Sequence, residues 1–272
     1  MGGKAAIVTG GGTGLGLAIS RELGRRGYPV VLASRKREHL EAGASSLAGE
    51  GVAVHTVPCD VRDRGQVERV LAEAEQQFGG VAILVNNAAG NFVVKAEALS
   101  PRGWEAVRGI VLDGTWNFSQ VVAQRWIAQG QGGSILNIIA TYAWTGAAGV
   151  VHSVSAKAAV LAMTRSLAVE WGRFGIRVNA LAPGIMVTEE AAKNLGYSDP
   201  QVQGWLAQQV PLGRLATPEE VARLAVDLVS DRHPYVTGDC WTVDGGLWLV
   251  GFPNLRRFLD GESWENDQPR RG

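Results

Sequence analysis

Short apolar runs alternate with longer amphipathic segments along the whole chain. Runs rich in Val, Ile, Leu and Ala, typical of strands buried on both faces, cover residues 5–9, 30–34, 52–57, 83–86, 134–140, 177–181 and 240–243. Helical periodicity fills the intervals over residues 14–26, 38–49, 63–78, 101–129, 150–174 and 218–229, with a looser helical stretch over 188–210. This alternation predicts an α/β fold with a doubly wound parallel sheet of about seven strands and helices on both faces.

Local signals set the limits of the predicted domain. Thr217, followed by Pro218 and two glutamates, is typical of a helix N-cap with proline at the first helical position and acids in the first turn. No repeat, low-complexity tract or Pro-rich linker interrupts the chain. Residues 252–272 are charged and rich in arginine. We therefore predict one domain over residues 1–251 and a surface tail or subunit contact over 252–272.

Composition excludes several classes of protein. The chain has 272 residues, of which 46% are hydrophobic, and its 26 Lys and Arg balance its 26 Asp and Glu. This balance argues against a nucleic-acid partner. Cys59 and Cys240 lie far apart, without clustered histidines, and predict neither a metal site nor a disulfide. No apolar run reaches the length that a bilayer requires, so we expect a cytoplasmic protein without a membrane span.

A glycine-rich segment directly follows the first predicted strand and opens the first helix. In this position, glycines let backbone N–H groups approach a pyrophosphate, so the segment predicts a Rossmann-like dinucleotide-binding domain. The alternative is a tight strand-to-helix turn without a ligand. The residues assigned to cofactor binding here are Gly10, Gly12, Thr13, Gly14, Leu15 and Gly16.

The end of the second predicted strand indicates which dinucleotide binds. An NAD site usually has an acid about 20 residues beyond the glycines, whereas this chain has Ser34-Arg35-Lys36. Two cations there favour a 2′-phosphate and predict NADP(H), although they also fit a solvated helix start. Asp60 and Val61, after the third strand, are expected beside the adenine, with a helix cap as the alternative for Asp60.

Four ordered motifs carry a resemblance that spans nearly the whole chain. They are Thr9-Gly10-Gly11-Gly12-Thr13-Gly14-Leu15-Gly16, Asn86-Asn87-Ala88-Ala89-Gly90, Pro183-Gly184 and Asp244-Gly245-Gly246. Together they resemble the short-chain dehydrogenase/reductase family. The resemblance implies that further residues contact the cofactor, namely Asn87, Ala88, Ala89, Lys157, Pro183, Gly184, Ile185 and Thr188. Thr188 also fits a helix cap.

The family's usual catalytic Tyr-x-x-x-Lys pair is incomplete in this chain. Lys157 is present, but Ser153 occupies the place of the tyrosine. The usual serine falls on Ala140, and the usual asparagine, three residues before Gly114, falls on Val111. Among the family's usual catalytic residues, only the lysine remains.

Two nearby residues, Asn91 and Tyr142, make the chain similar to the 2,4-dienoyl-CoA reductase subgroup. The resemblance implies that Asn91 and Tyr142 hold the thioester carbonyl, while Lys157 binds the nicotinamide ribose and is steadied by Ser153. Each residue also has an ordinary interpretation. Tyr142 could be a loop aromatic bonded to backbone, Asn91 a turn former and Ser153 a helix N-cap.

The replacement of the tyrosine fits the chemistry of a conjugated thioester. Hydride adds at the far end of the conjugated system, and negative charge develops on the thioester oxygen. A neutral phenol and an amide are suitable donors to that oxygen. The proton for the α-carbon is then expected from water. The resemblance thus implies an NADPH-dependent acyl-CoA reductase of fatty-acid β-oxidation and a homo-oligomer, in particular a tetramer.

Three other functions stay open at this level. They are a trans-2-enoyl-CoA reductase, an ordinary carbonyl or alcohol dehydrogenase, and a protein that binds NADP(H) without catalysis. Trp144 and Phe92 could line an acyl pocket or serve loop packing, and His152 is expected to face away from the site. The candidates by charge for contacts with CoA are Lys95, Arg102, Lys193 and Arg256.

Overall fold

A single parallel sheet organises the residues that the computed structural model describes, which are 3–188 and 198–250. Its strands are β1 (Ala5–Thr9), β2 (Val30–Ser34), β3 (Val54–Pro58), β4 (Val81–Asn86), β5 (Gly133–Ile138), β6 (Ile176–Pro183) and β7 (Cys240–Val243). The strand order is β3-β2-β1-β4-β5-β6-β7. The central strand β1 pairs Ala6 with Val30 of β2 and with Ile83 of β4. The predicted fold class is confirmed.

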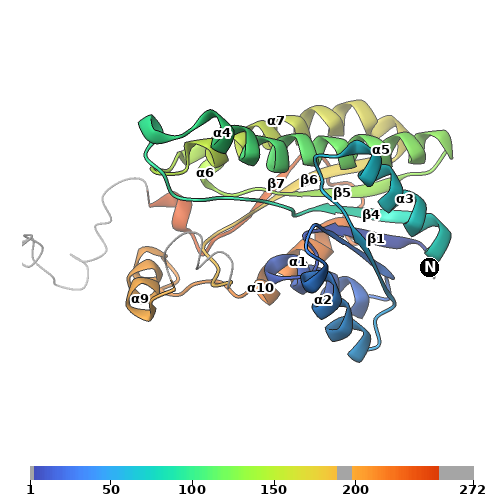
Figure 1. The fold of residues 1–272 in the computed structure, drawn as a ribbon, viewed down its shortest axis with the longest axis horizontal. Helices are drawn as coiled ribbons and strands as arrows, with labels where there is room; N and C mark the ends of the chain where they lie inside the picture. Colours follow the sequence, from blue (N-terminus) through green and yellow to red (C-terminus); the bar gives the residue numbers. More distant parts are fainter. Residues whose placement is uncertain (1–2, 189–197, 251–272) are drawn as a thin grey trace, which may run out of the picture.

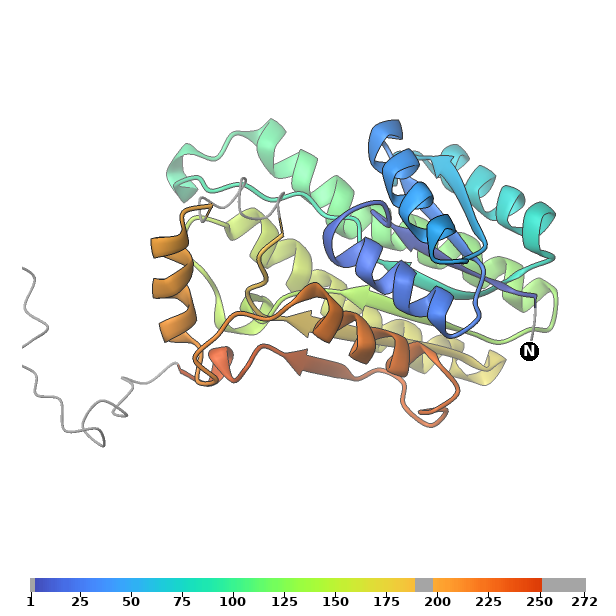
Figure 2. The ribbon, with the colours of Figure 1, turned by 90° about the horizontal axis from the view of Figure 1, so that it is seen from below.

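Helices cover both faces of this sheet (Figure 1). The first layer holds α1 (Gly14–Arg25), α2 (Arg37–Gly49) and α10 (Pro218–Val229), which Figure 2 brings to the front. The opposite layer holds α3 (Arg64–Phe78), α5 (Gly114–Ala128) and α7 (Val151–Trp171). Along β1 the side chains alternate between the layers, because Ala6 and Val8 join the first core and Ala5 and Ile7 join the second.

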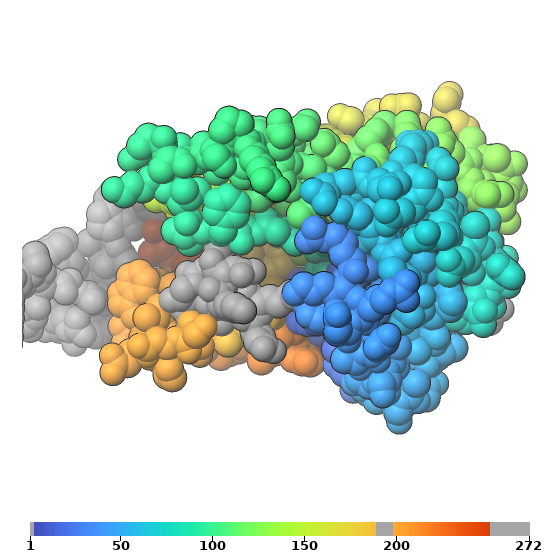
Figure 3. Space-filling model, in the orientation of Figure 1, coloured from blue at the N-terminus to red at the C-terminus, as the bar shows by residue number. Residues whose placement is uncertain are grey.

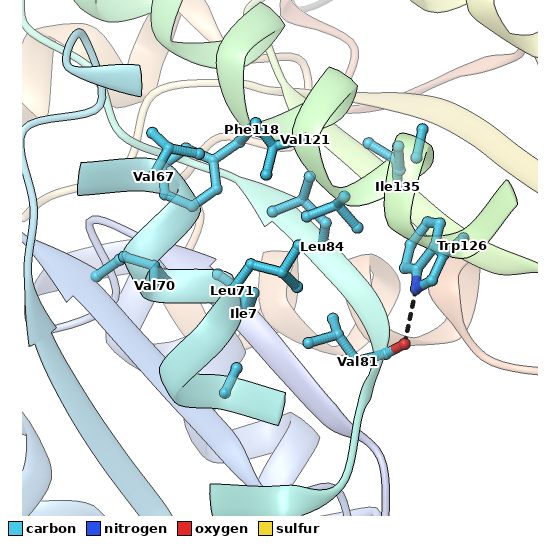
Figure 4. Packing of buried hydrophobic residues seen from close by; sticks show 14 of the residues in the cluster. Ile7, Val67, Val70, Leu71, Val81, Leu84, Phe118, Val121, Trp126 and Ile135 are labelled. Carbon is cyan, nitrogen blue, oxygen red and sulfur yellow. Dashed lines mark hydrogen bonds between the residues drawn. The ribbon is translucent and has the colours of Figure 1, made fainter. Parts of the chain in front are cut away.

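A buried hydrogen bond anchors the end of α5 to the sheet (Figure 4). The indole of Trp126, 1% exposed, donates a hydrogen bond of 2.8 Å from Nε1 to the backbone carbonyl of Val81. Gly133 gives the ring its room, because a Cβ there would lie 2.5 Å from the indole. The contact fixes the start of β4 and β5 against α5 and satisfies the one polar atom of the indole.

The structure corrects the prediction of one long helix over 101–129. It contains α4 (Pro101–Arg108), a π-helical segment η2 (Gly109–Asp113) and then α5. One wide turn leaves the hydrophobic period almost unchanged, so the periodicity gave no sign of it. Gly114 lets α5 approach the loop that follows β3, because a Cβ at Gly114 would lie 2.4 Å from the Val61 side chain.

The remaining elements connect the layers. They are the short helices η1 (Ala96–Ala98), α6 (Tyr142–Thr145), η3 (Gly172–Phe174) and η4 (Leu247–Leu249), and the helix α9 (Pro200–Gln209). Helix α9 accounts for the end of the looser predicted stretch, and residues 189–197 lie outside the described ranges, as does the predicted tail over 252–272. The predicted start of α10 is confirmed, because Thr217 and Glu220 form a reciprocal capping box. In the described ranges, no helix is long and apolar enough to cross a membrane.

Candidate active site

The carboxyl ends of the strands open onto a cavity of about 1110 Å³. It lies where the strand order reverses between β1 and β4, the usual ligand position in a doubly wound sheet. In Figure 3, the residues after β4 are green and lie at the top of this face, and the residues of α9 are orange and lie below them. The predicted residues that line the cavity are Gly10, Thr13, Gly14, Leu15, Gly16, Ser34, Arg35, Lys36, Val61, Asn87, Ala88, Ala89, Asn91, Tyr142, Lys157, Pro183, Gly184, Ile185 and Thr188.

The glycine-rich loop is shaped by close backbone contacts. Gly10 and Gly14 have φ values of +63° and +50°, which side-chain-bearing residues rarely adopt. A Cβ on Gly16 would lie 2.1 Å from the carbonyl oxygen of Gly10. The amide of Asn87 donates hydrogen bonds of 3.0 and 3.3 Å to the carbonyls of Thr9 and Gly10. The loop is thus held open at the N-terminus of α1, where backbone N–H groups attract a phosphate.

Gly12 stands apart from the other glycines because it is absent from the cavity lining. A Cβ at Gly12 would lie 2.4 Å from the carbonyl oxygen of His39, and a Cβ at Gly43 would lie 2.9 Å from the Cα of Gly12. Gly12 therefore allows α2 to pack against the loop, and a direct contact with a cofactor stays a prediction.

The cations after β2 are free to meet an anion. Arg35 and Lys36 are exposed at the cavity wall, and none of the described residues forms an ion pair or hydrogen bond with either side chain. Asp60 is engaged, since Arg62 donates to both of its carboxylate oxygens. The bond from Arg62 lowers the pKa of Asp60. Asp60 is absent from the lining, so its predicted place beside an adenine stays a prediction.

The loop after β6 closes the cavity opposite the glycines. Gly184 lies close to the Asp244 backbone, because a Cβ at Gly184 would be 2.7 Å from the Asp244 Cα. Thr188 lies against the start of α1, with its methyl carbon 3.4 Å from the Cβ position of Gly14. The glycine-rich loop and the loop after β6, both predicted to contact the cofactor, therefore lie against one cavity.

The Tyr142 phenol and the Ser153 hydroxyl form a hydrogen bond of 3.0 Å. Tyr142 begins α6, while Ser153 is buried in the first turn of α7, which is capped by Val150. The structure therefore favours neither a backbone partner for the Tyr142 hydroxyl nor an N-cap role for Ser153. Burial raises the pKa of Tyr142, and the bond from Ser153 opposes this in part. The phenol therefore stays protonated at neutral pH and can donate.

Lys157 is buried one turn after Ser153, and its ammonium group donates a 2.5 Å hydrogen bond to the Ile138 carbonyl. Burial lowers the pKa of Lys157 to about 8. In the described ranges no hydrogen bond joins Lys157 to Ser153, so the predicted steadying of the lysine by this serine stays a prediction.

Asn91 lies in the loop after β4, with its side-chain oxygen turned to its own backbone. The N–H of Phe92 donates a 3.0 Å hydrogen bond to Asn91 Oδ1. This contact is the turn predicted as the ordinary interpretation, and it leaves the amide NH₂ group as a donor. Because Asn91 and Tyr142 both line the cavity, the two interpretations of Asn91 are compatible.

The positions of the family's usual serine and asparagine are compatible with a catalytic site that uses Tyr142 and Asn91 in their place. Val111 is 1% exposed inside the π-helical segment, and its neighbour Ile110 lines the cavity. Ala140 also lines the cavity, two residues before Tyr142. Neither Val111 nor Ala140 has a side chain that can form a hydrogen bond.

The remaining lining residues were not among the predicted site residues. They are Ala33, His39, Cys59, Gly90, Ile110, Ile138, Ile139, Ala140, Thr141, Thr145, Ala147, Met186, Leu206, Leu247, Trp248 and Val250. Most are apolar residues at strand ends or in loops, which a periodicity pattern cannot distinguish from core. Lys95 and Arg102 are described and lie outside the lining, while Lys193 and Arg256 lie outside the described residues. Phe92 and Trp144 are also absent from the lining.

His152 faces away from the cavity, as predicted, and is 1% exposed. Its ring stacks on Phe92 with 4.4 Å between centroids, and both ring nitrogens lack a hydrogen-bond partner among the described residues. Burial lowers the pKa of His152. The folded protein therefore disfavours the proton that the unfolded chain accepts below pH of about 6.5.

We expect His152→Leu to stabilise the protein at acidic pH. The folded-state pKa lies below the unfolded value, so the wild type should lose stability as the pH falls below about 6.5. The leucine variant should lose less, and removal of two unpaired buried nitrogens should add on the order of 1 kcal/mol at neutral pH. Urea unfolding at pH 7.5 and 5.5 measures both effects. Equal pH dependence in the two proteins would contradict this assignment.

Comparison with known proteins identifies relatives that match most of this chain. A family profile described as Enoyl-(Acyl carrier protein) reductase matches residues 10–248. A probable 2,4-dienoyl-CoA reductase [(2E)-enoyl-CoA-producing] of Bacillus subtilis is 47% identical, covering 92% of this chain and 98% of that protein. A peroxisomal 2,4-dienoyl-CoA reductase [(3E)-enoyl-CoA-producing] of Danio rerio is 40% identical, covering 94% and 85%. A short chain dehydrogenase structure from Bacillus anthracis has a TM-score of 0.83 and 44% identity, covering 92% and 98%.

The chain therefore belongs to the short-chain dehydrogenase/reductase family, whose members are oxidoreductases that use a nicotinamide cofactor. Within that family, the resemblance to the 2,4-dienoyl-CoA reductase subgroup, predicted from Asn91 and Tyr142, is confirmed.

Proposed function

We propose that this protein reduces 2,4-dienoyl-CoA thioesters with NADPH. The observation that carries the proposal is the Tyr142–Ser153 hydrogen bond, in a cavity that also holds Asn91 and Lys157. A phenol at this place is two residues from Ala140, where the family's usual serine would stand. The relatives from Bacillus subtilis and Danio rerio, both named as dienoyl-CoA reductases, give independent support.

The glycine loop and the cations fit a dinucleotide. The backbone at Gly10 and Gly14 leaves space where a phosphate would bind, and Arg35 with Lys36 would hold a 2′-phosphate. Lys157 would hold the nicotinamide ribose. When bound, NADPH supplies the hydride that adds at the far end of the diene.

Residues of this chain stabilise the negative charge that develops on the substrate after hydride addition. Tyr142 and Asn91 donate hydrogen bonds to the thioester oxygen as it becomes negative. Either hydroxyl can donate in the 3.0 Å bond between Tyr142 and Ser153. With Ser153 as the donor, the phenol proton is left for the thioester oxygen of the substrate. Two donors that already line the cavity need little rearrangement during the reaction, and water supplies the proton for the α-carbon.

The test is NADPH oxidation by the purified protein with a 2,4-dienoyl-CoA, a trans-2-enoyl-CoA and a simple ketone. Turnover confined to the dienoyl thioester supports the proposal. Turnover of the enoyl thioester alone supports the trans-2-enoyl-CoA reductase instead, and tight NADPH binding without turnover supports a non-catalytic protein. NMR of the product locates the remaining double bond. Protonation at the α-carbon predicts a 3-enoyl product, whereas the Bacillus subtilis relative is named for a 2-enoyl product.

We expect Arg35→Ala to raise the Kd for NADPH about 10-fold to 100-fold and to leave the Kd for NADH within twofold. The reason is that a hydrogen bond to a charged group contributes about 1.5–3 kcal/mol, and only NADPH carries the 2′-phosphate. Arg37→Ala is the matched control, because Arg37 is exposed at the start of α2 and lies outside the lining. Fluorescence titration of the wild type and both variants with NADPH and NADH measures the six dissociation constants. An equal rise of the Kd for NADPH and NADH would contradict the assignment of Arg35 to the 2′-phosphate.

The proposal extends to assembly. The family resemblance supports a homo-oligomer, in particular a tetramer. Trp116 on α5 and Val169 on α7 are 38% and 86% exposed, respectively, and such apolar side chains are compatible with a subunit contact. Light scattering during size-exclusion chromatography tests this part.

A further inference from the structure

The cavity has an apolar end that the reaction chemistry leaves unexplained. Its walls come from segments far apart in the chain, and the residues are Ala147, Met186, Leu206, Leu247, Trp248 and Val250. Arg35 follows β2 and Trp248 follows β7, so the cavity crosses the carboxyl edge of the sheet. Five strand spacings of about 4.8 Å separate these ends by about 24 Å. Tyr142 and Asn91, which follow β5 and β4, lie between them.

Trp248 is held in place by its backbone rather than by burial. Its N–H donates a 2.8 Å hydrogen bond to Asp244 Oδ2, and the Gly246 N–H donates a 2.9 Å bond to Asp244 Oδ1. Asp244 is 7% exposed, whereas Trp248 is 40% exposed. The structure thus fixes a large apolar side chain at the cavity wall and leaves much of its surface to be covered by a ligand.

A second tryptophan connects this wall to the catalytic group. The indole of Trp144 packs edge-on against Trp248, with 5.9 Å between centroids and 86° between planes. Trp144 lies on α6, two residues after Tyr142. Trp144 therefore links the cavity wall at Trp248 to the short helix that carries the Tyr142 phenol, which we assign to the thioester oxygen. A substrate held there by its carbonyl has the Trp248 indole within reach of its apolar part.

We propose that Trp248 is the surface on which the acyl chain beyond the diene packs, so that the enzyme selects longer dienoyl-CoA substrates over short ones. This inference rests on the proposed function. A buried methylene changes affinity about fourfold. The four methylene-sized groups that separate a six-carbon from a ten-carbon chain are thus sufficient for a large preference, even when only half of them contact the indole.

The experiment compares 2,4-hexadienoyl-CoA with 2,4-decadienoyl-CoA on the wild type, Trp248→Ala and Trp248→Phe. We expect Trp248→Ala to lower kcat/KM for the ten-carbon substrate at least 10-fold and for the six-carbon substrate less than twofold. Trp248→Phe should give an intermediate loss, and it keeps a ring against Trp144 in case the alanine variant folds poorly. An unchanged Kd for NADPH shows that each variant is folded.

The matched control is Trp205→Ala. Trp205 is 59% exposed on α9, next to the lining residue Leu206, but lies outside the lining itself. Trp205→Ala should leave kcat/KM for both substrates unchanged. In Trp248→Ala, an equal loss of kcat/KM for both substrates is expected if Trp248 contacts the CoA moiety or has a structural role. That result would overturn this inference and leave the proposed function intact. An unchanged kcat/KM for both substrates would do the same. A wild type without activity on any dienoyl-CoA would overturn the proposed function together with it.

Discussion

Tyr142→Phe should lower kcat on a dienoyl-CoA by about 100-fold or more and leave the Kd for NADPH unchanged. Removal of one oxyanion donor typically has an effect of this size, because the bond forms fully only in the transition state. Phenylalanine keeps the ring and removes only the hydroxyl that meets Ser153 at 3.0 Å. Steady-state kinetics with a separate NADPH titration distinguishes the two quantities.

The chain offers a matched control for this change. Tyr235 is fully exposed, so Tyr235→Phe should have the kinetics of the wild type. Burial raises the pKa of Tyr142 above its usual value of 10.0, so deprotonation of the phenol should not lower the activity below pH of about 10. Unchanged turnover in Tyr142→Phe would remove this residue from the oxyanion site.

Lys157→Ala should weaken NADPH binding by about 10-fold or more and lower kcat as well. The ammonium is buried and is expected to hold the nicotinamide ribose, and a hydrogen bond from a charged donor contributes about 1.5–3 kcal/mol. Its pKa of about 8 adds a signature in pH. Binding favours the protonated lysine, so the wild-type Kd for NADPH should rise as the pH increases through about 8.

NADPH titrations from pH 6.5 to 9.5 test this prediction. Lys157→Ala should lack the rise in Kd, because it has no group that titrates at this position. Lys4→Met is the control, since Lys4 is exposed, lies far from the cavity lining and bonds Gln131 at 2.6 Å. A wild-type Kd that is flat across this range, or an intact Kd in Lys157→Ala, would contradict the role of the lysine.

The sequence predicted the parts of the structure that depend on local pattern. Strands buried on both faces and a glycine loop at the start of a helix have signatures within a few residues, which is why β1 and the loop from Gly10 to Gly16 were located correctly. The π-helical turn at Val111 was missed because one extra residue per turn hardly disturbs the hydrophobic period.

Long-range contacts were harder to predict than elements. The resemblance to the subgroup pointed to Tyr142, but only the fold shows that its hydroxyl meets Ser153, eleven residues away on another helix. Trp248 carried no signal, because it meets the cavity through a turn after the last strand. Phe92 and Trp144, which the sequence placed beside the site, support it from outside the lining.

Asp244 constrains two segments of the cavity wall, one through its backbone and the other through its buried carboxylate. On one side its backbone leaves room only for glycine at position 184, in the loop expected to hold the nicotinamide; on the other its oxygens fix the turn that carries Trp248. New chain-length variants are therefore best sought as exchanges of residues 245–250 around an unchanged Asp244. Substitution of the Asp244 side chain would remove both hydrogen bonds of the turn that carries Trp248, while the backbone at this position would still require glycine at position 184.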